Sequence, residues 1–119
     1  MGNFRDLKVW EKAHRLTLGV YTVTALFPRD EMYGLTGQLR RSSSSIPTNI
    51  AEGSGRDSDT ELIRFLHIAM GSAAELDYQL LLARDLNFLE LAQYDGMSGS
   101  VAEVQSMLAS LIRKLKTKD

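Results

Sequence analysis

The sequence predicts an all-α protein, an antiparallel up-down-up-down four-helix bundle. Apolar residues recur at helical spacing in four long segments. The connections between these segments are short and contain proline, glycine or a capping motif. No segment shows the alternation of apolar and polar residues that is typical of a strand. The chain of 119 residues is expected to form one domain, residues 1–119, with a single core.

The first helix is predicted from about Leu7 to Phe27, with Asn3 or Asp6 as its cap and Pro28 as its stop. Its apolar arc is wider than one partner helix needs. We therefore expect this helix to contact two neighbours, one of which could belong to another subunit.

The second helix is predicted to begin between Asp30 and Leu35 and to end near Gly53, although Pro47 lies inside it. An interior proline removes a backbone hydrogen bond and costs about 3 kcal/mol when nothing offsets the loss. The four serines at 42–45 are expected to bond the carbonyls that the proline leaves free.

The third helix is predicted to start at the capping box Ser58-Asp59-Thr60-Glu61 and to run to about Leu86. The fourth begins at residue 90 or 91 and ends near Lys116. The stretch Gly71-Ser72-Ala73-Ala74 forms a patch of small residues where another backbone could approach closely.

Polar side chains form an ordered row beside the apolar row of the second helix, and a similar row lies on the third. We interpret the two rows as a buried network of ion pairs and hydrogen bonds that sets the register of the bundle. Its predicted members are Gln38, Arg41, Asn49, Glu52, Ser72 and Glu75. The alternative, an acid–base cluster around Glu52 and Glu75, is less favoured because four well-patterned helices leave no obvious pocket.

The sequence predicts no catalytic residue, metal site or cofactor, and therefore no enzyme. There is no cysteine, and neither His14 nor His67 completes the paired Glu-x-x-His motifs of a di-iron bundle. No nucleophile triad, phosphate-binding glycine loop or paired-carboxylate motif occurs. The polar N-terminus and the short apolar runs predict a cytoplasmic protein that does not enter a membrane.

The net charge of −1 is low for a dedicated nucleic-acid-binding protein. Nucleic-acid binding would therefore need local clusters of basic residues. The candidates are Arg40, Arg41, Arg113, Lys114, Lys116 and Lys118. For the last four residues, favourable charge at a helix C-terminus is the alternative explanation.

Several motifs lie along nearly the whole chain. They are Phe4-x-x-Leu7-x-x-Trp10-x-x-Ala13, Phe27-Pro28-x-x-Glu31, Gly34-Leu35-Thr36-x-Gln38-Leu39-Arg40-Arg41, Ser45-Ile46-Pro47-x-Asn49-Ile50-Ala51-Glu52-Gly53 and Ala69-x-Gly71-Ser72-x-x-Glu75-Leu76. With these motifs the chain resembles the four-helix proteins encoded by intervening sequences in bacterial 23S ribosomal RNA genes. The same fold is similar to the accessory variability protein of diversity-generating retroelements.

The resemblance implies a four-helix protomer that assembles into a barrel-like homopentamer. For the retroelement relatives it implies binding to nucleic acid and to a reverse transcriptase through a basic surface, whereas the intervening-sequence proteins have no established biochemical function. We therefore expect a non-enzymatic bacterial accessory protein, a homo-oligomer that binds RNA or a ribonucleoprotein through an assembled ring. Five weak basic patches acting together would raise the effective affinity. The alternative is a protein–protein adaptor or scaffold without nucleic-acid binding, which the slightly acidic balance favours.

Overall fold

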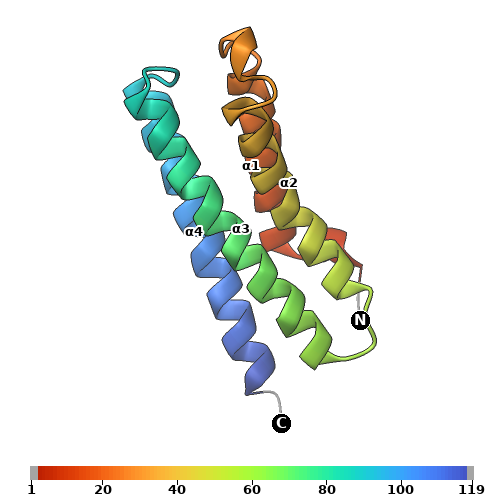
Figure 1. The fold of residues 1–119 in the computed structure, drawn as a ribbon. Coiled ribbons are helices and arrows are strands. Elements are labelled where there is room, and N and C mark those ends of the chain that lie inside the picture. The colour runs from red at the N-terminus through yellow and green to blue at the C-terminus, as the bar shows by residue number, and fades with distance from the viewer. Residues whose placement is uncertain (1–2, 118–119) are drawn as a thin grey trace.

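The computed structural model describes residues 3–117, and within this range it contains helices and no strand. Consecutive helices pack as neighbours and the fourth returns to the first, which closes an antiparallel bundle (Figure 1). The predicted all-α, four-helix fold is confirmed. None of the helices in this range is long and apolar enough to cross a bilayer. The elements are η1 (Phe4–Asp6), α1 (Lys8–Thr24), η2 (Arg29–Glu31), α2 (Leu35–Ser54), α3 (Asp59–Asp85) and α4 (Leu91–Lys116).

Helix α1 is shorter than predicted at both ends. Asn3 does act as a cap, but for η1, where its side chain accepts a hydrogen bond of 3.0 Å from the Arg5 amide. At the other end α1 stops at Thr24. A following proline disfavours helical backbone in the residue before it, so the helix cannot continue through Phe27. Phe27 instead turns into the core, where its ring lies 5.5 Å from that of Phe88.

The backbone of α2 continues through Pro47 because a side chain from α1 supplies the missing donor. In a regular helix the Ser43 carbonyl would accept a hydrogen bond from the amide of residue 47. Here the buried Thr17 hydroxyl lies 3.0 Å from the Ser43 oxygen and 3.0 Å from the Ala13 oxygen, so its one proton is shared between them. The serines at 42–44 bond carbonyls three residues earlier. The expectation that the serines fill the freed carbonyl is therefore wrong.

The last turn of α2 lies very close to the first turns of α3. A Cβ atom placed on Gly53 would lie 2.8 Å from the Phe65 Cβ and 3.0 Å from the Leu62 Cδ1. Such distances are too short for any side chain, so only glycine permits this approach. Helix α3 then starts as predicted, with the Ser58 hydroxyl accepting a hydrogen bond of 3.2 Å from the Glu61 amide.

The α3–α4 connection depends on Asn87, which has a φ of 64°. The Asn87 and Phe88 amides donate hydrogen bonds of 2.9 Å to the Arg84 and Ala83 carbonyls, which closes the end of α3. Asparagine accepts this left-handed conformation more readily than most residues do. Helix α4 then begins with the Gln93 side chain accepting a hydrogen bond from the Glu90 amide at 3.1 Å.

The core lies along the axis of the bundle and contains aliphatic side chains from all four helices. The α1–α2 and α3–α4 connections lie at one end of the bundle, while the start of α1 and the end of α4 lie at the other (Figure 1). The largest fully buried side chains include Leu39, Ile46, Ile50, Leu66, Leu76, Leu80 and Leu108.

Candidate interaction surfaces

The two arginines of α2 that were predicted to bind nucleic acid have different surroundings. The Arg40 Nε donates a hydrogen bond of 2.9 Å to the Thr24 hydroxyl, and its guanidinium lies 4.6 Å from the centre of the Tyr21 ring. Both contacts are with α1, so Arg40 helps to hold α2 against α1. Arg41 is exposed and forms no ion pair within residues 3–117. Arg41 is therefore the more accessible of the two.

The other predicted basic residues lie in the last turn of α4. Arg113, Lys114 and Lys116 are exposed, and no ion pair in the described part of the chain involves them. Lys118 lies outside the described residues. Because Arg41 is in the first half of α2, near the opposite end of the bundle, one protomer does not unite these cations in a single patch (Figure 1).

A row of hydrogen-bonded side chains joins α2 to α3, and we call it the polar seam. It consists of Ser42, Ser45 and Asn49 from α2 with Ser72, Glu75 and Gln79 from α3. The hydroxyls of Ser45 and Ser72 lie 2.8 Å apart, and the Asn49 Nδ2 donates to the Ser45 Oγ at 3.0 Å. The Ser42 hydroxyl donates to the Gln79 Oε1 at 2.7 Å, and the Gln79 Nε2 lies 3.5 Å from the Glu75 Oε2.

The polar seam differs from the predicted network in its members and in its chemistry. Asn49, Ser72 and Glu75 belong to it, whereas Gln38, Arg41 and Glu52 are exposed outside it. Glu52 pairs with Arg56, four residues later and just beyond the end of α2, at 2.8 Å. Both side chains stay in water, so burial of Glu52 against α3 would add a desolvation cost and offers no gain. No ion pair joins α2 to α3 within residues 3–117.

Two structural partners, Thr17 and Ser42, were not identified from the sequence as members of the polar rows. Ser45 and Gln79 lie in the predicted rows of the second and third helices but were not included in the predicted network. Gln79 follows Ser72 and Glu75 on the same face of α3, and this periodicity was a usable signal. Thr17 gives no such signal, because its role depends on how α1 lies against the proline of α2.

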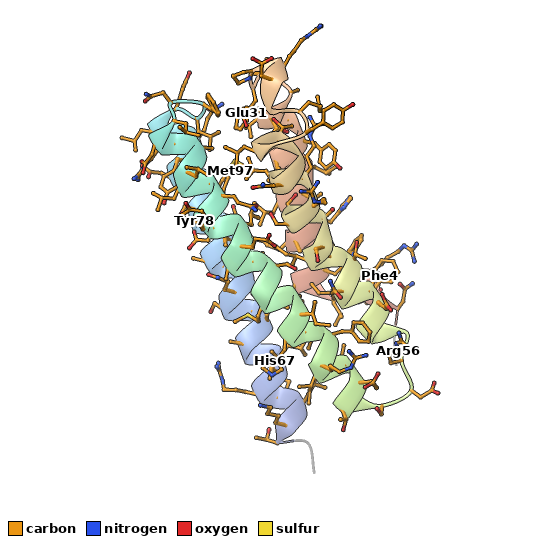
Figure 2. The ribbon with its side chains drawn as sticks, in the orientation of Figure 1. Phe4, Glu31, Arg56, His67, Tyr78 and Met97 are labelled. Atoms are coloured by element: carbon orange, nitrogen blue, oxygen red, sulfur yellow. The ribbon has the colours of Figure 1, made fainter. Side chains whose placement is uncertain are left out.

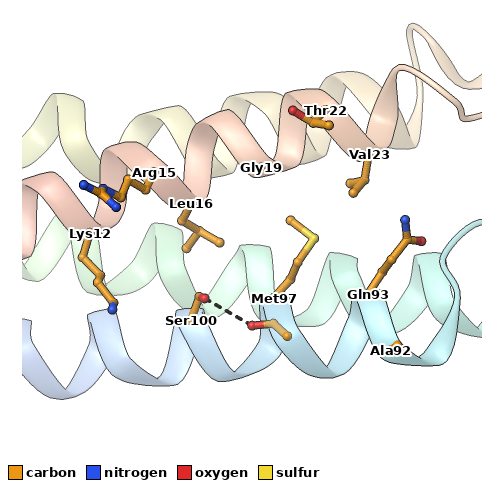
Figure 3. Close-up of a pocket in the computed structure, with 11 residues that line it drawn as sticks. Lys12, Arg15, Leu16, Gly19, Thr22, Val23, Ala92, Gln93, Met97 and Ser100 are labelled. Atoms are coloured by element: carbon orange, nitrogen blue, oxygen red, sulfur yellow. Dashed lines mark hydrogen bonds between the residues drawn. The ribbon is translucent and has the colours of Figure 1, made fainter.

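An open groove runs between α1 and α4 (Figure 3). Its hollow of about 490 Å³ is lined mainly by apolar atoms. Leu16 and Val23 from α1 and Met97 from α4 point into it, while Lys12 and Arg15 lie at one end (Figure 3). Among neighbouring helix pairs, α1 and α4 are the least closely packed. The groove is therefore a chiefly apolar concave surface that the described protomer leaves open.

Large apolar side chains also lie uncovered elsewhere on the protomer. Tyr33 is 99% exposed and Leu26 is 85% exposed, both near the α1–α2 connection. Leu18 of α1 and Tyr78 of α3 are 53% and 61% exposed (Figure 2 labels Tyr78). Exposed apolar residues that lie singly are ordinary on a protein surface, and only a continuous patch of them is typical of an interaction site.

The ring contacts at the start of α1 explain one of the two histidines. The His14 ring stacks on Trp10 with centroids 5.0 Å apart, and Phe4 packs edge-on against the same indole at 4.9 Å. Glu11, which precedes His14 at the i, i+3 spacing, pairs with Arg15 at 3.0 Å. Within residues 3–117, no group of three or more metal-ligating side chains is placed to hold an ion.

An ion pair at the start of α3 shifts the pKa values of both its partners, lowering that of Glu61 and raising that of Arg64. The Arg64 guanidinium donates hydrogen bonds of 3.2 Å to both oxygens of Glu61. These hydrogen bonds, followed by the charge of the same arginine, lower the pKa of the Glu61 carboxyl. The pair lies in solvent on one turn of helix, so it is a local surface contact and no acid–base centre.

The comparisons with known proteins agree with this architecture. The chain matches a solved protein of unknown function from the S23 ribosomal protein family of Bacteroides thetaiotaomicron with a TM-score of 0.81 and 25% sequence identity. That match covers 88% of this chain and 95% of the other. No curated protein matches the chain. The model of the 23S rRNA-intervening sequence proteins matches residues 5–110. Because this match spans most of the sequence, the chain belongs to the 23S rRNA-intervening sequence protein family.

Proposed function

We propose that the protein is a non-enzymatic accessory protein that assembles into a homo-oligomer and binds structured RNA or a ribonucleoprotein. The observation that carries the proposal is that four of the predicted basic residues, Arg41, Arg113, Lys114 and Lys116, are exposed and form no ion pair in the described chain. In a ring, the last turn of α4 would recur once per copy. Phosphate contacts repeated in this way act together and compensate for a near-neutral protomer. The names of the family and of its structural relative agree with an RNA-linked role.

Filter binding to a structured RNA tests this function. We expect the affinity to fall steeply between about 50 and 200 mM salt, because bound cations release counterions from the phosphates. The variant Arg113→Ala/Lys116→Ala should bind more weakly and show a shallower salt dependence. Its control is Arg56→Ala/Arg84→Ala, which removes the same charge from two arginines already held in ion pairs. Salt-insensitive binding, absent binding or equal losses in both variants would refute RNA binding.

The uncovered apolar side chains support the oligomer. Leu18 and Tyr21 lie on α1, the helix whose apolar arc exceeds what the protomer core uses. Light scattering at micromolar concentration should give a mass several-fold above 13.3 kDa, with five copies the favoured number. Leu18→Glu changes an exposed position and should reduce this mass while leaving the helical content intact. A monomeric wild-type protein would contradict the proposed assembly.

A protein–protein adaptor is the second candidate function. The open groove between α1 and α4 favours it, because an apolar hollow suits an apolar side chain better than a phosphate. A pull-down that retains one defined protein after nuclease treatment would select this function over RNA binding.

A further inference from the structure

The hollow between α1 and α4 is one part of a longer groove. A neighbouring hollow shares Lys12 and Arg15 with it, and a third hollow shares Lys8 and Met107 with the second. Together they follow the α1–α4 interface from Val23 to Lys8. Fifteen residues of helix rise about 22 Å, so the groove has the length of a helix of about 16 residues.

One half of this groove is apolar and roomy. Leu16, Val23 and Met97 form its walls, and Gly96 contributes no side chain. A Cβ atom placed on Gly96 would meet nothing within 4 Å, and one on Gly19 would meet only the Met97 Cε at 3.8 Å. Incoming side chains therefore find space here without displacing backbone. Methionine also adapts its shape readily to different apolar partners.

The other half carries the charged side chains of the groove, although its end beside Lys114 is again lined mainly by apolar atoms. Lys8, Lys12, Arg15 and Lys114 line it, against the two carboxylates Glu11 and Glu103. Lys12 crosses the groove to Glu103 at 2.9 Å, and Arg15 pairs with Glu11. Lys8 and Lys114 form no ion pair within residues 3–117. This half thus has two cations in excess on a chain whose net charge is −1.

We infer that this groove binds an amphipathic helix of a partner protein, with apolar residues against Leu16, Val23 and Met97 and carboxylates against Lys8 and Lys114. The inference rests on the adaptor function and names the chemistry of its partner. A helix in the groove of two antiparallel helices is a common recognition mode. A nucleic acid suits the groove less well, because phosphates need cations along their whole path. Beyond Arg15, the residues that line the apolar hollow carry no charge.

A displayed library of 16-residue helices with randomised faces tests the inference against the full-length protein. We expect the selected helices to be apolar at one end and enriched in Asp and Glu at the other. Gly96→Leu fills the apolar half and should weaken their binding at least 10-fold. The matched control is Gly71→Leu, the same change on an exposed position of α3 where an added Cβ also meets nothing. Lys8→Glu/Lys114→Glu should weaken binding similarly, and peptides with Lys in place of Glu should restore it.

Four outcomes would overturn the inference. The first is that the selected helices bind Gly96→Leu as tightly as the wild type, and the second is that they show no enrichment of carboxylates. A Gly96→Leu protein of smaller mass would show that a second copy fills the groove. If the library yields no binding helix and Gly96→Leu loses RNA binding, the groove would be assigned to RNA. The RNA proposal is tested separately, because Arg113→Ala/Lys116→Ala should weaken RNA binding and leave helix binding unchanged.

Discussion

Replacing Thr17 with valine removes the hydroxyl that lets α2 contain a proline. Valine has nearly the same shape as threonine, so the apolar packing of α1 against α2 should survive. The Ser43 carbonyl, which Pro47 deprives of its amide donor, then loses its bond from Thr17 as well. A buried polar group without a partner costs about 1–3 kcal/mol. For a chain of this size, each kcal/mol lowers the melting temperature by about 4 °C.

A double-mutant cycle with Pro47→Ala isolates this effect. Alanine at position 47 restores an amide that can donate to the Ser43 carbonyl, so Thr17→Val should cost less in that background. We expect a coupling free energy of about 1–2 kcal/mol. The cost of the small cavity left by removing the proline ring occurs in both backgrounds and cancels. Urea unfolding followed by circular dichroism at 222 nm, at one fixed protein concentration, measures all four proteins.

The reasoning would fail on either of two results. Additive effects, with a coupling below about 0.5 kcal/mol, would show that the Thr17 hydroxyl and the proline are independent. A stable Thr17→Val protein, within about 0.5 kcal/mol of the wild type, would show that the Ser43 carbonyl has another partner, such as water.

Three further predictions concern the turns and surface of the bundle. In urea unfolding, Gly53→Ala should destabilise the protein by about 1–3 kcal/mol, because the added Cβ would overlap α3. Gly71→Ala, on the exposed face of α3, should stabilise it by about 0.5–1 kcal/mol, because alanine favours a helix more than glycine does. Asn87→Gly should raise the free energy of unfolding, because glycine adopts a positive φ without strain. Asn87→Ala should lower the free energy of unfolding by about 1–2 kcal/mol, because alanine is strained at the same φ. Arg64→Gln should raise the pKa of Glu61 in an NMR titration. Because that pKa is depressed in the folded protein, any stability from the pair exists above the unfolded-state pKa and is lost as the pH falls through the folded-state value.

The sequence was sufficient for the fold because its strongest signals are local. Four apolar periodicities, the Ser58 cap and the stops at Pro28 and near Gly53 place most helix ends within about three residues of their observed bounds. The end of α1 was placed too late, because the apolar Phe27 also fits a helical pattern. Its side chain reaches the core from a turn, where it packs against Phe88 in the α3–α4 connection.

The surfaces were harder to predict because they depend on contacts between helices. Arg40 and Arg41 are neighbours of the same type, yet Tyr21 and Thr24 engage only the first. Glu52 has the spacing of a buried row but pairs with Arg56, just past the end of its own helix. The groove between α1 and α4 has no sequence motif, because it arises where two helices that each contribute a glycine to its lining do not pack closely.

The two hydrogen-bonded pairs between α2 and α3 have a consequence for the alignment of the whole molecule. Sliding α3 along α2 by one turn, about 5.4 Å, would still bring leucines and alanines opposite aliphatic neighbours. The same slide would separate Ser42 from Gln79 and Ser45 from Ser72, so polar atoms between the helices would lose their hydrogen-bond partners. Small uncharged groups thus discriminate against misaligned packing that hydrophobic burial alone would tolerate. They thereby fix how far along the bundle axis the α3–α4 hairpin, which carries Gly96, stands beside the α1–α2 hairpin, which carries Gly19, and so they set the shape of the groove that both glycines line.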